Sequence, residues 1–553
     1  MVLVVGMIYN FSMLRELFEK INSTRITLAQ WMMAFFGVMF VRIFLENFSS
    51  IPATGNWTSD ASTIVHYYLY YVAVTVSLLL FLGLFIDRAK LERVSLFALA
   101  GNVVAPLLDL FISHGQGFLM HYIFADGSGL FTSFFLFFTP ATIPGITPGM
   151  KIEFCFGLLA FFLYVAYSTR SAVKGALAAL GSYAIMFFWG SLPSFWKLIH
   201  DLFSSQGSAL SVSQFFGTGA TESVIARNFF HPTVQVSYLR SLEVFFNVAI
   251  SEIYYILIFV LVAIYFFTRN RRAFFAILEN SRQFRAAHYY LLILIGLLLG
   301  SKIAPAWISW NWFDAVSLAV LFLAFFCARA FAGGVNDIED LEADRVSNSK
   351  RPLPSGRLAP DDIKNANLFF LVWAILGGFL VGQYVLFTII AALFISYIYS
   401  VPPLRLKNYP FIATFLISLA SCAAFAAGFY FTSPDKTTKA LPIVYLVLII
   451  VGLTLGENVK DIKDIEGDKR SGAYTLPVIF GEEMGKRIIG ILAAVAFMSV
   501  PVILGSVELF IPSLLAGSAA YFLIDRKKYT EWPIFLVGSL YAAIVIPLFL
   551  FIS

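Results

Sequence analysis

Long apolar runs separated by short basic loops fill this chain and restrict what it can fold into. Across 553 residues, 59% of the side chains are hydrophobic and only 13% are charged. A soluble core of this size would need far more polar surface to cover it. A membrane-spanning helix needs about 20 mostly apolar residues, and the chain holds many such runs. The sequence therefore predicts an all-α integral membrane protein surrounded by membrane lipids.

About fifteen apolar runs are candidate transmembrane helices, six in the first half of the chain and nine in the second. The basic, polar stretch 269–285 separates the two sets. We therefore expect a six-span domain over residues 1–268, a cytoplasmic linker over 269–285 and a nine-span domain over 286–553. The candidate spans lie near 28–46, 64–86, 94–113, 152–169, 175–194, 244–268, 286–303, 313–332, 366–382, 384–400, 410–431, 441–458, 487–505, 508–524 and 533–552.

The basic residues indicate the orientation of the chain in the membrane. The net charge of +5 is dispersed in short clusters between apolar runs and builds no single basic face, so no nucleic-acid partner is expected. If residues 1–27 are cytoplasmic, nearly all of these clusters fall inside, as the positive-inside rule requires. The start of the chain, MVLVVGMIYNF, lacks the features of a cleavable signal peptide. We expect a multi-pass protein of the cell membrane with its N-terminus inside and its C-terminus outside.

An acidic segment directly follows the candidate span 313–332. It contains Asn336, Asp337, Asp340 and Asp344. At about 100° per residue in an α-helix, Asn336, Asp340 and Asp344 spread over only about 80° of one helix face. Arg329 lies two turns earlier on the same side. The pattern predicts a polar site at the cytoplasmic end of this span.

A second acidic segment follows the candidate span 441–458. Glu457, Asp461, Asp464 and Asp468 are predicted to share a helical stripe about 60° wide. Like charges at this spacing repel each other, so the stripe implies a compensating cation. A solvated helix end would account for one such cluster. Two clusters on the same predicted side of the membrane favour a functional site.

The ligand types suggest which cation this is. Carboxylate and amide oxygens without His or Cys nearby suit Mg²⁺ or Mn²⁺ rather than zinc. Mg²⁺ typically combines one or two carboxylates with water and substrate phosphate, which indicates a phosphorylated substrate. Basic residues on the same predicted side fit a diphosphate site. These are Arg329, Lys350, Arg351, Arg405, Lys407, Lys460, Lys469 and Arg470.

Both acidic segments match motifs of a known family. Residues 336–344, with the pattern NDxxDxxxD and followed by KRPLPSG at 350–356, resemble the first motif of the UbiA family of intramembrane prenyltransferases. Residues 461–468, DxxDxxxD, are similar to the second motif, and the stretch YSVPPLRLK at 399–407 also matches. The resemblance covers about residues 280–553. It implies a nine-helix UbiA-like prenyltransferase bundle, preceded here by the six-helix membrane domain.

The resemblance also implies a mechanism and its residues. The expected protein is a Mg²⁺-dependent prenyltransferase that ionises an allylic polyprenyl diphosphate and transfers the prenyl group to a lipophilic acceptor. Two Mg²⁺ ions would stabilise the leaving diphosphate, and apolar helices would exclude water from the carbocation. The implied metal ligands are Asn336, Asp340 and Asp344 for one ion and Asp461, Asp464 and Asp468 for the other, with Asp337 as a further catalytic residue.

The stretch 456–481 bears on the acceptor. It looks most like family members that build archaeal-type ether lipids. The best candidate acceptor is therefore a geranylgeranylglyceryl phosphate-like ether-lipid precursor, and an aromatic quinone precursor is the next.

The first 268 residues depart from the family pattern and carry no recognised motif. Arg42 and Glu252 lie within candidate spans, where ionisable groups are costly and often functional. Asp109, His114 and His121 could form a polar site, although hydrogen-bonded histidines at the membrane interface are commoner.

Two other classes of function remain open for the whole chain. One is a polytopic transporter, which more often carries its carboxylates at the membrane midplane. The other is a noncatalytic scaffold that retains the fold, which a loss of acidic residues would favour, whereas both motifs are intact here.

Overall fold

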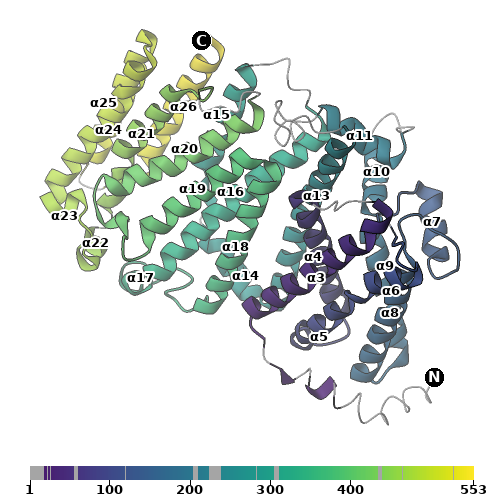
Figure 1. Cartoon of the computed structure of the whole chain (residues 1–553). Coiled ribbons are helices and arrows are strands. Elements are labelled where there is room, and N and C mark those ends of the chain that lie inside the picture. Colours follow the sequence, from purple (N-terminus) through teal and green to yellow (C-terminus); the bar gives the residue numbers. More distant parts are fainter. Residues whose placement is uncertain are drawn as a thin grey trace. The chain divides into compact units, whose positions relative to one another are not determined.

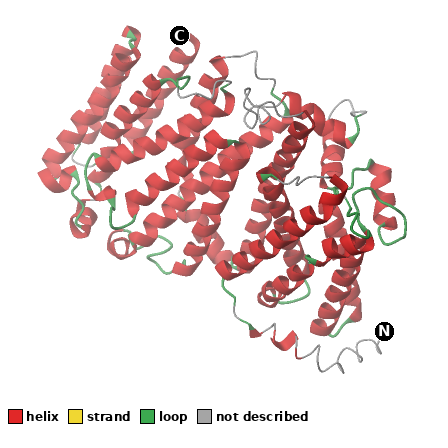
Figure 2. Ribbon diagram, in the orientation of Figure 1, coloured by secondary structure: helices red, strands yellow, loops and turns green. Residues whose placement is uncertain are grey.

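The computed structural model describes almost the whole chain, and the described residues are helical or in loops, with no strand among them (Figure 2). The predicted all-α fold is therefore confirmed. The described residues are 26–54, 60–118, 120–203, 210–222, 238–281, 283–303, 310–433, 439–463, 465–526 and 529–552, with a few single positions between 16 and 24.

The chain forms two compact units that meet in sequence between Asn270 and Arg271. Within the predicted linker 269–285, residues Arg271–Asn280 are helical. The first unit (Figure 1) contains α3 (Leu28–Thr54), α4 (Ala61–Leu82), α5 (Arg88–Gly101), α6 (Val104–Ile112), α7 (Gly127–Leu136), α8 (Pro148–Thr169), α9 (Ala172–Gly190), α10 (Leu192–Phe203), α11 (Val212–Glu222) and α13 (Tyr238–Arg269).

The second unit is a bundle of long helices joined by short ones (Figure 1). Its long helices are α15 (Gln283–Ile303), α16 (Trp312–Glu339), α18 (Pro360–Val381), α19 (Gln383–Ser400), α20 (Ile412–Thr432), α21 (Ile443–Gly456), α24 (Glu482–Leu504), α25 (Phe510–Ile524) and α26 (Trp532–Ile552). Its short helices are α14 (Arg271–Asn280), α17 (Leu341–Ser347), η2 (Leu406–Asn408), η3 (Glu457–Ile462), α22 (Ile465–Ser471), α23 (Leu476–Phe480) and η4 (Val507–Leu509).

Twelve helices within the described residues are long and apolar enough to cross a membrane, five in the first unit and seven in the second. With its family membership, established below, this makes the chain an integral multi-pass membrane protein. The predicted count of fifteen spans is not confirmed. Two of the remaining candidates, in α15 and α26, have shorter apolar stretches at Ala287–Lys302 and Trp532–Val545.

The third remaining candidate, the single span 94–113, was predicted wrongly because the structure divides it into α5 and α6. Pro106 has no backbone N–H, so the carbonyl of Asn102 lacks its helical donor four residues later. The guanidinium of Arg42, on α3, donates a hydrogen bond to that carbonyl instead. The break therefore leaves a polar backbone group inside the first unit, and a buried cation satisfies it.

The start of α16 fixes where the first acidic motif lies. The side chain of Asn311 accepts hydrogen bonds from the backbone N–H groups of Phe313, at 2.9 Å, and Asp314, at 3.2 Å. Asp314 returns the bond by accepting from the Asn311 N–H at 3.1 Å. This capping box satisfies otherwise unpaired amides at the helix start. From there α16 runs 28 residues to Glu339, directly before Asp340.

Helices α15 and α20 pack so closely that side chains do not fit between their backbones. A Cβ atom added at Gly428 of α20 would lie 2.0 Å from the carbonyl oxygen of Ile293 on α15. One added at Gly296 of α15 would lie 2.2 Å from the carbonyl oxygen of Phe425. Small residues at such crossings let membrane helices gain van der Waals contact in the absence of a hydrophobic driving force.

This packing predicts that Gly428→Val destabilises the protein by about 1–3 kcal/mol, because the new side chain must push two backbones apart. Gly452→Val on α21 is the matched control, since a Cβ there meets no atom within 4 Å. Thermal unfolding of the purified protein in detergent micelles measures both. Equal melting temperatures for the two variants would contradict the close crossing.

Candidate active site

The first acidic motif continues across the junction between α16 and α17. Asp340 caps the end of α16, yet its N–H donates to the carbonyl of Asn336 at 2.9 Å. The N–H of Asp344 donates in turn to the carbonyl of Asp340 at 2.8 Å. These backbone bonds keep Asn336, Asp340 and Asp344 one helical turn apart, so they lie on one face as predicted, although α16 ends between them.

Two cations from the loop between α19 and α20 hold the Asp340 carboxylate. Arg405 donates to one oxygen at 2.8 Å, and Lys407 donates to the other at 2.5 Å. Lys407 also donates to the amide oxygen of Asn336 at 3.0 Å, and Ser400 donates to the same oxygen at 3.2 Å. Burial holds the pKa of the Lys407 ammonium below its ordinary value, and the Asp340 carboxylate opposes that shift.

Asp344 and Asp337 share a third cation, Arg351. Its guanidinium donates to Asp344 at 2.5 Å and lies 3.8 Å from an oxygen of Asp337. The side chain of Asn348 donates to the other Asp344 oxygen at 2.8 Å. Asp337 is 1% exposed and Asp344 is 5% exposed. Burial of such carboxylates is costly unless they have charged or hydrogen-bonded partners.

The second acidic motif is less regular than predicted. α21 ends at Gly456, a 3₁₀ helix covers Glu457–Ile462, and α22 starts at Ile465. The predicted continuous α-helical stripe is therefore wrong, because the change to 3₁₀ geometry alters the rotation per residue. Glu457 forms an ion pair with Lys460, and Asp461 and Asp468 are half-buried. Asp464 and the side chain of Arg470 lie outside the described residues.

The two motifs lie at one end of the second unit. α17, which carries Asp344, contacts α22, which carries Asp468, and Figure 1 shows both at the same end of the bundle. Tyr399 lies close enough to both Asp340 and Asp461 to interact electrostatically with their carboxylates. Tyr289 similarly lies near Arg329, Lys460 and Glu457. The fold therefore brings together segments that are more than a hundred residues apart in the sequence.

Other predicted diphosphate-binding residues have less contact with this cluster. The side chain of Lys350 is exposed, and its backbone carbonyl accepts from Arg357 at 2.8 Å. Lys469 is also exposed, whereas Arg329 is half-buried. The roles of all these residues stay predictions.

The residues fit a Mg²⁺ ion whose remaining ligands come from a substrate phosphate and water. Within the described part of the chain, no three His, Cys, Asp or Glu side chains form a closed metal-binding group. Mg²⁺ does not need one, because it takes one or two carboxylates and completes its octahedron with phosphate and water. Asn336, Asp340 and Asp344 provide only hard oxygen donors at one helix-turn spacing.

Sequence reasoning missed three residues of this cluster. Ser400 and Tyr399 lie in the same YSVPPLRLK stretch as Arg405 and Lys407, so their proximity to the motif could have been expected. Asn348 lies four residues after Asp344, the spacing at which helical side chains meet.

Comparison with known proteins identifies the family. The UbiA prenyltransferase family matches residues 289–535. The digeranylgeranylglyceryl phosphate synthase of Methanopyrus kandleri is 32% identical over 229 residues, which cover 39% of this chain and 74% of that protein. The chlorophyll synthase of Avena sativa is 26% identical, over 45% of this chain and 71% of that one. The chain belongs to the UbiA prenyltransferase family through its C-terminal half.

The coverage of some relatives is smaller. The chain spans 56% of the digeranylgeranylglyceryl phosphate synthase of Methanocaldococcus jannaschii, at 29% identity over 30% of this chain. It spans 62% of the corresponding Methanobrevibacter smithii protein, at 31% identity over 31% of this chain. Among solved structures, a UbiA homologue from Archaeoglobus fulgidus bound to GPP and Mg²⁺ is 20% identical with a TM-score of 0.38, and covers 50% of this chain and all of its own.

The geometry predicts a strong coupling between Asp344 and Arg351, because the Asp344 carboxylate is buried and the Arg351 guanidinium is only partly exposed. A double-mutant cycle with Asp344→Asn and Arg351→Gln is expected to give a coupling free energy of about 1–3 kcal/mol. Glu342 and Arg345, an exposed pair at 2.7 Å in the same short helix, provide the matched cycle, expected below about 1 kcal/mol. Unfolding in mixed micelles measures both, and equal coupling energies would refute the assigned burial.

Proposed function

We propose that the second unit is a Mg²⁺-dependent intramembrane prenyltransferase that uses a polyprenyl diphosphate donor. The observation that carries this proposal is the convergence of the two acidic motifs. α17 contacts α22, and basic side chains of one loop reach into the first motif. A transporter or a noncatalytic scaffold would not require acidic and basic groups to gather in this way at one helix end.

Each motif residue has a proposed role. Asn336, Asp340 and Asp344 would hold one Mg²⁺, and Asp461, Asp464 and Asp468 a second, with Mn²⁺ as a possible substitute. Bound Mg²⁺ would supply Lewis-acid stabilisation of the departing diphosphate. Asp337 would keep Arg351 oriented through their 3.8 Å contact.

The basic residues have a proposed role of their own. Arg405 and Lys407 already lie within hydrogen-bonding distance of Asp340, so their charges are available to diphosphate oxygens next to that carboxylate. Arg329, Lys350, Lys460, Lys469 and Arg470 would contribute further positive charge on the same side of the membrane.

The apolar helices of the unit would exclude water while an allylic cation exists, since water would quench it. The acceptor is proposed to be lipophilic. Digeranylgeranylglyceryl phosphate synthases among the relatives support a geranylgeranylglyceryl phosphate-like ether-lipid precursor. Plant aromatic prenyltransferases support an aromatic quinone precursor as the second candidate.

The proposed orientation follows from the charge distribution. Placing the two motifs in the cytoplasm puts most basic loop clusters on that side, in agreement with the positive-inside rule. The N-terminus would then be cytoplasmic and the C-terminus outside the cell membrane.

The first test is an assay of the full-length protein in detergent with Mg²⁺, geranylgeranyl diphosphate and a lipid extract of its host. New prenylated lipids, identified by mass spectrometry, are expected. Asp340→Asn should lower the rate at least about 10²-fold, because a group that stabilises developing charge is lost. Asp361→Asn, at an exposed carboxylate outside both motifs, should retain the full rate. Undiminished turnover by Asp340→Asn would refute the assignment.

Metal removal is a separate test. Chelation by EDTA should abolish product formation, and added Mg²⁺ should restore it, because hard oxygen ligands bind this ion reversibly. Binding of radiolabelled diphosphate, measured alongside, should also fall in EDTA. Full turnover after chelation would contradict a metal-dependent mechanism.

A further inference from the structure

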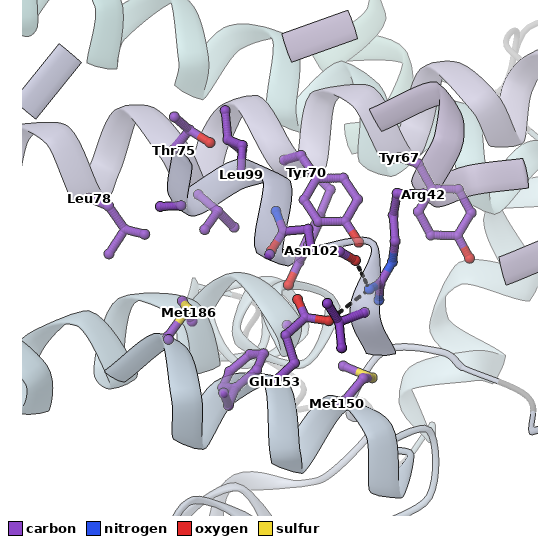
Figure 3. Close-up of a pocket in the computed structure, with 18 of the residues that line it drawn as sticks. Arg42, Tyr67, Tyr70, Thr75, Leu78, Leu99, Asn102, Met150, Glu153 and Met186 are labelled. Atoms are coloured by element: carbon purple, nitrogen blue, oxygen red, sulfur yellow. Dashed lines mark hydrogen bonds and ion pairs between the residues drawn. The ribbon is translucent and has the colours of Figure 1, made fainter. Parts of the chain in front are cut away.

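The first unit contains a large cavity, separate from the acidic motifs. Its volume is about 890 Å³, and helices α3, α4, α5, α8 and α13 contribute to its walls. Ligand pockets commonly enclose about 300–1,000 Å³, so this one has room for a lipid-sized molecule. The cavity is polar at one end and apolar at the other (Figure 3).

The polar end is built around Arg42, which is 3% exposed. Its guanidinium pairs with Glu46 and donates to the Asn102 carbonyl and, at 2.8 Å, to Glu153. Figure 3 shows the bonds to Asn102 and Glu153. One cation thus faces two carboxylates, and a third carboxylate, Glu243, also lines the cavity. Arg42 is therefore already engaged by two carboxylates, which disfavours an anionic ligand at this end.

Two tyrosine hydroxyls at this end are available for a ligand. Tyr67 and Tyr70 of α4 both line the cavity, and neither hydroxyl makes a hydrogen bond to any described residue. The neighbouring Tyr122 differs, because its hydroxyl bonds His66 at 2.8 Å and Tyr254 at 2.9 Å. Polar groups in an apolar cavity favour a partner that can satisfy them.

The other end of the cavity is apolar. Leu78 of α4, Leu99 of α5 and Met186 of α9 line it away from Arg42 (Figure 3). A hydrocarbon chain would be buried there, and burial of each methylene contributes about 0.8 kcal/mol. The change from a polar end to an apolar end therefore matches an amphiphile with a small polar head.

We propose that this cavity binds an uncharged lipid whose head carries a hydroxyl or carbonyl oxygen. The head would exchange hydrogen bonds with Tyr67 and Tyr70 beside the Arg42 cluster, and the chain would lie along Leu78, Leu99 and Met186. A phosphorylated head would have to displace Glu46 or Glu153 from Arg42, which selects against phosphorylated lipids. The site is independent of the diphosphate chemistry proposed for the second unit.

The test measures equilibrium binding of tritiated geranylgeraniol to the full-length protein in nanodiscs. Geranylgeranyl phosphate and the corresponding hydrocarbon without a hydroxyl serve as competitors. The alcohol is expected to bind, and each competitor should be at least about tenfold weaker, the effect of losing one or two hydrogen bonds or adding an unfavourable charge.

Two pairs of variants locate the binding. Tyr67→Phe with Tyr70→Phe should weaken alcohol binding about tenfold. Tyr68→Phe is the control, because that hydroxyl donates to the carbonyl of Phe36 and does not line the cavity. Gly157→Phe should abolish binding by filling the cavity, since a Cβ at this lining position meets no atom within 4 Å. Gly37→Phe also enters open space, but outside the cavity, and should leave binding unchanged.

Several results would overturn the proposal. Binding that is the same in Gly157→Phe and Gly37→Phe would place the lipid elsewhere, including in the second unit. Tighter binding of the phosphorylated lipid would contradict the charge argument, and equal binding of the hydrocarbon would remove the role of the polar end. Circular dichroism of each variant confirms that it is folded.

Discussion

Charge compensation at the ends of the long helices holds the candidate site of the second unit together. Asp337, Asp340 and Asp344 are held in a region where isolated carboxylates would be costly. Their charges are compensated by Arg351, Arg405 and Lys407, which come from two different loops. These ion pairs connect the ends of α16, α19 and α20, so the positions of the helices and the site depend on each other.

The close packing of the long helices fixes the position of the loop that carries Arg405 and Lys407. Gly296, Gly300 and Gly428 bring α15 and α20 to backbone contact, and α19 packs on α20 as well. The loop that carries Arg405 and Lys407 connects α19 directly to α20. A shift at the glycine crossing would therefore move the two cations relative to Asp340, although these three glycines are not themselves part of the site.

Sequence periodicity predicted much of this arrangement but not its irregular parts. Helical spacing was sufficient for Asn336, Asp340 and Asp344, because backbone bonds carry the rotation across the junction of α16 and α17. It failed for Glu457–Ile462, where the backbone tightens to a 3₁₀ helix. The prediction of one span at 94–113 rested on the length of an apolar run, and that length does not reveal the break before Pro106 or the pairing of the Asn102 carbonyl with Arg42, sixty residues away. Pairings such as Asp340 with Arg405 are tertiary, and no local pattern specifies them.

The first acidic motif and the Arg42 cluster pair their charges differently, and this difference bears on what each is proposed to bind. In the first motif three carboxylates meet three cations, so the cluster is neutral before any ligand arrives. If the carboxylates hold Mg²⁺ as proposed, the three cations would become available to the oxygens of a diphosphate. In the first unit, Arg42 is already paired with Glu46 and Glu153. A phosphate would have to displace these carboxylates from Arg42, whereas a hydroxyl would not. The same residue types therefore support two different proposals, a diphosphate at one cluster and an uncharged lipid at the other.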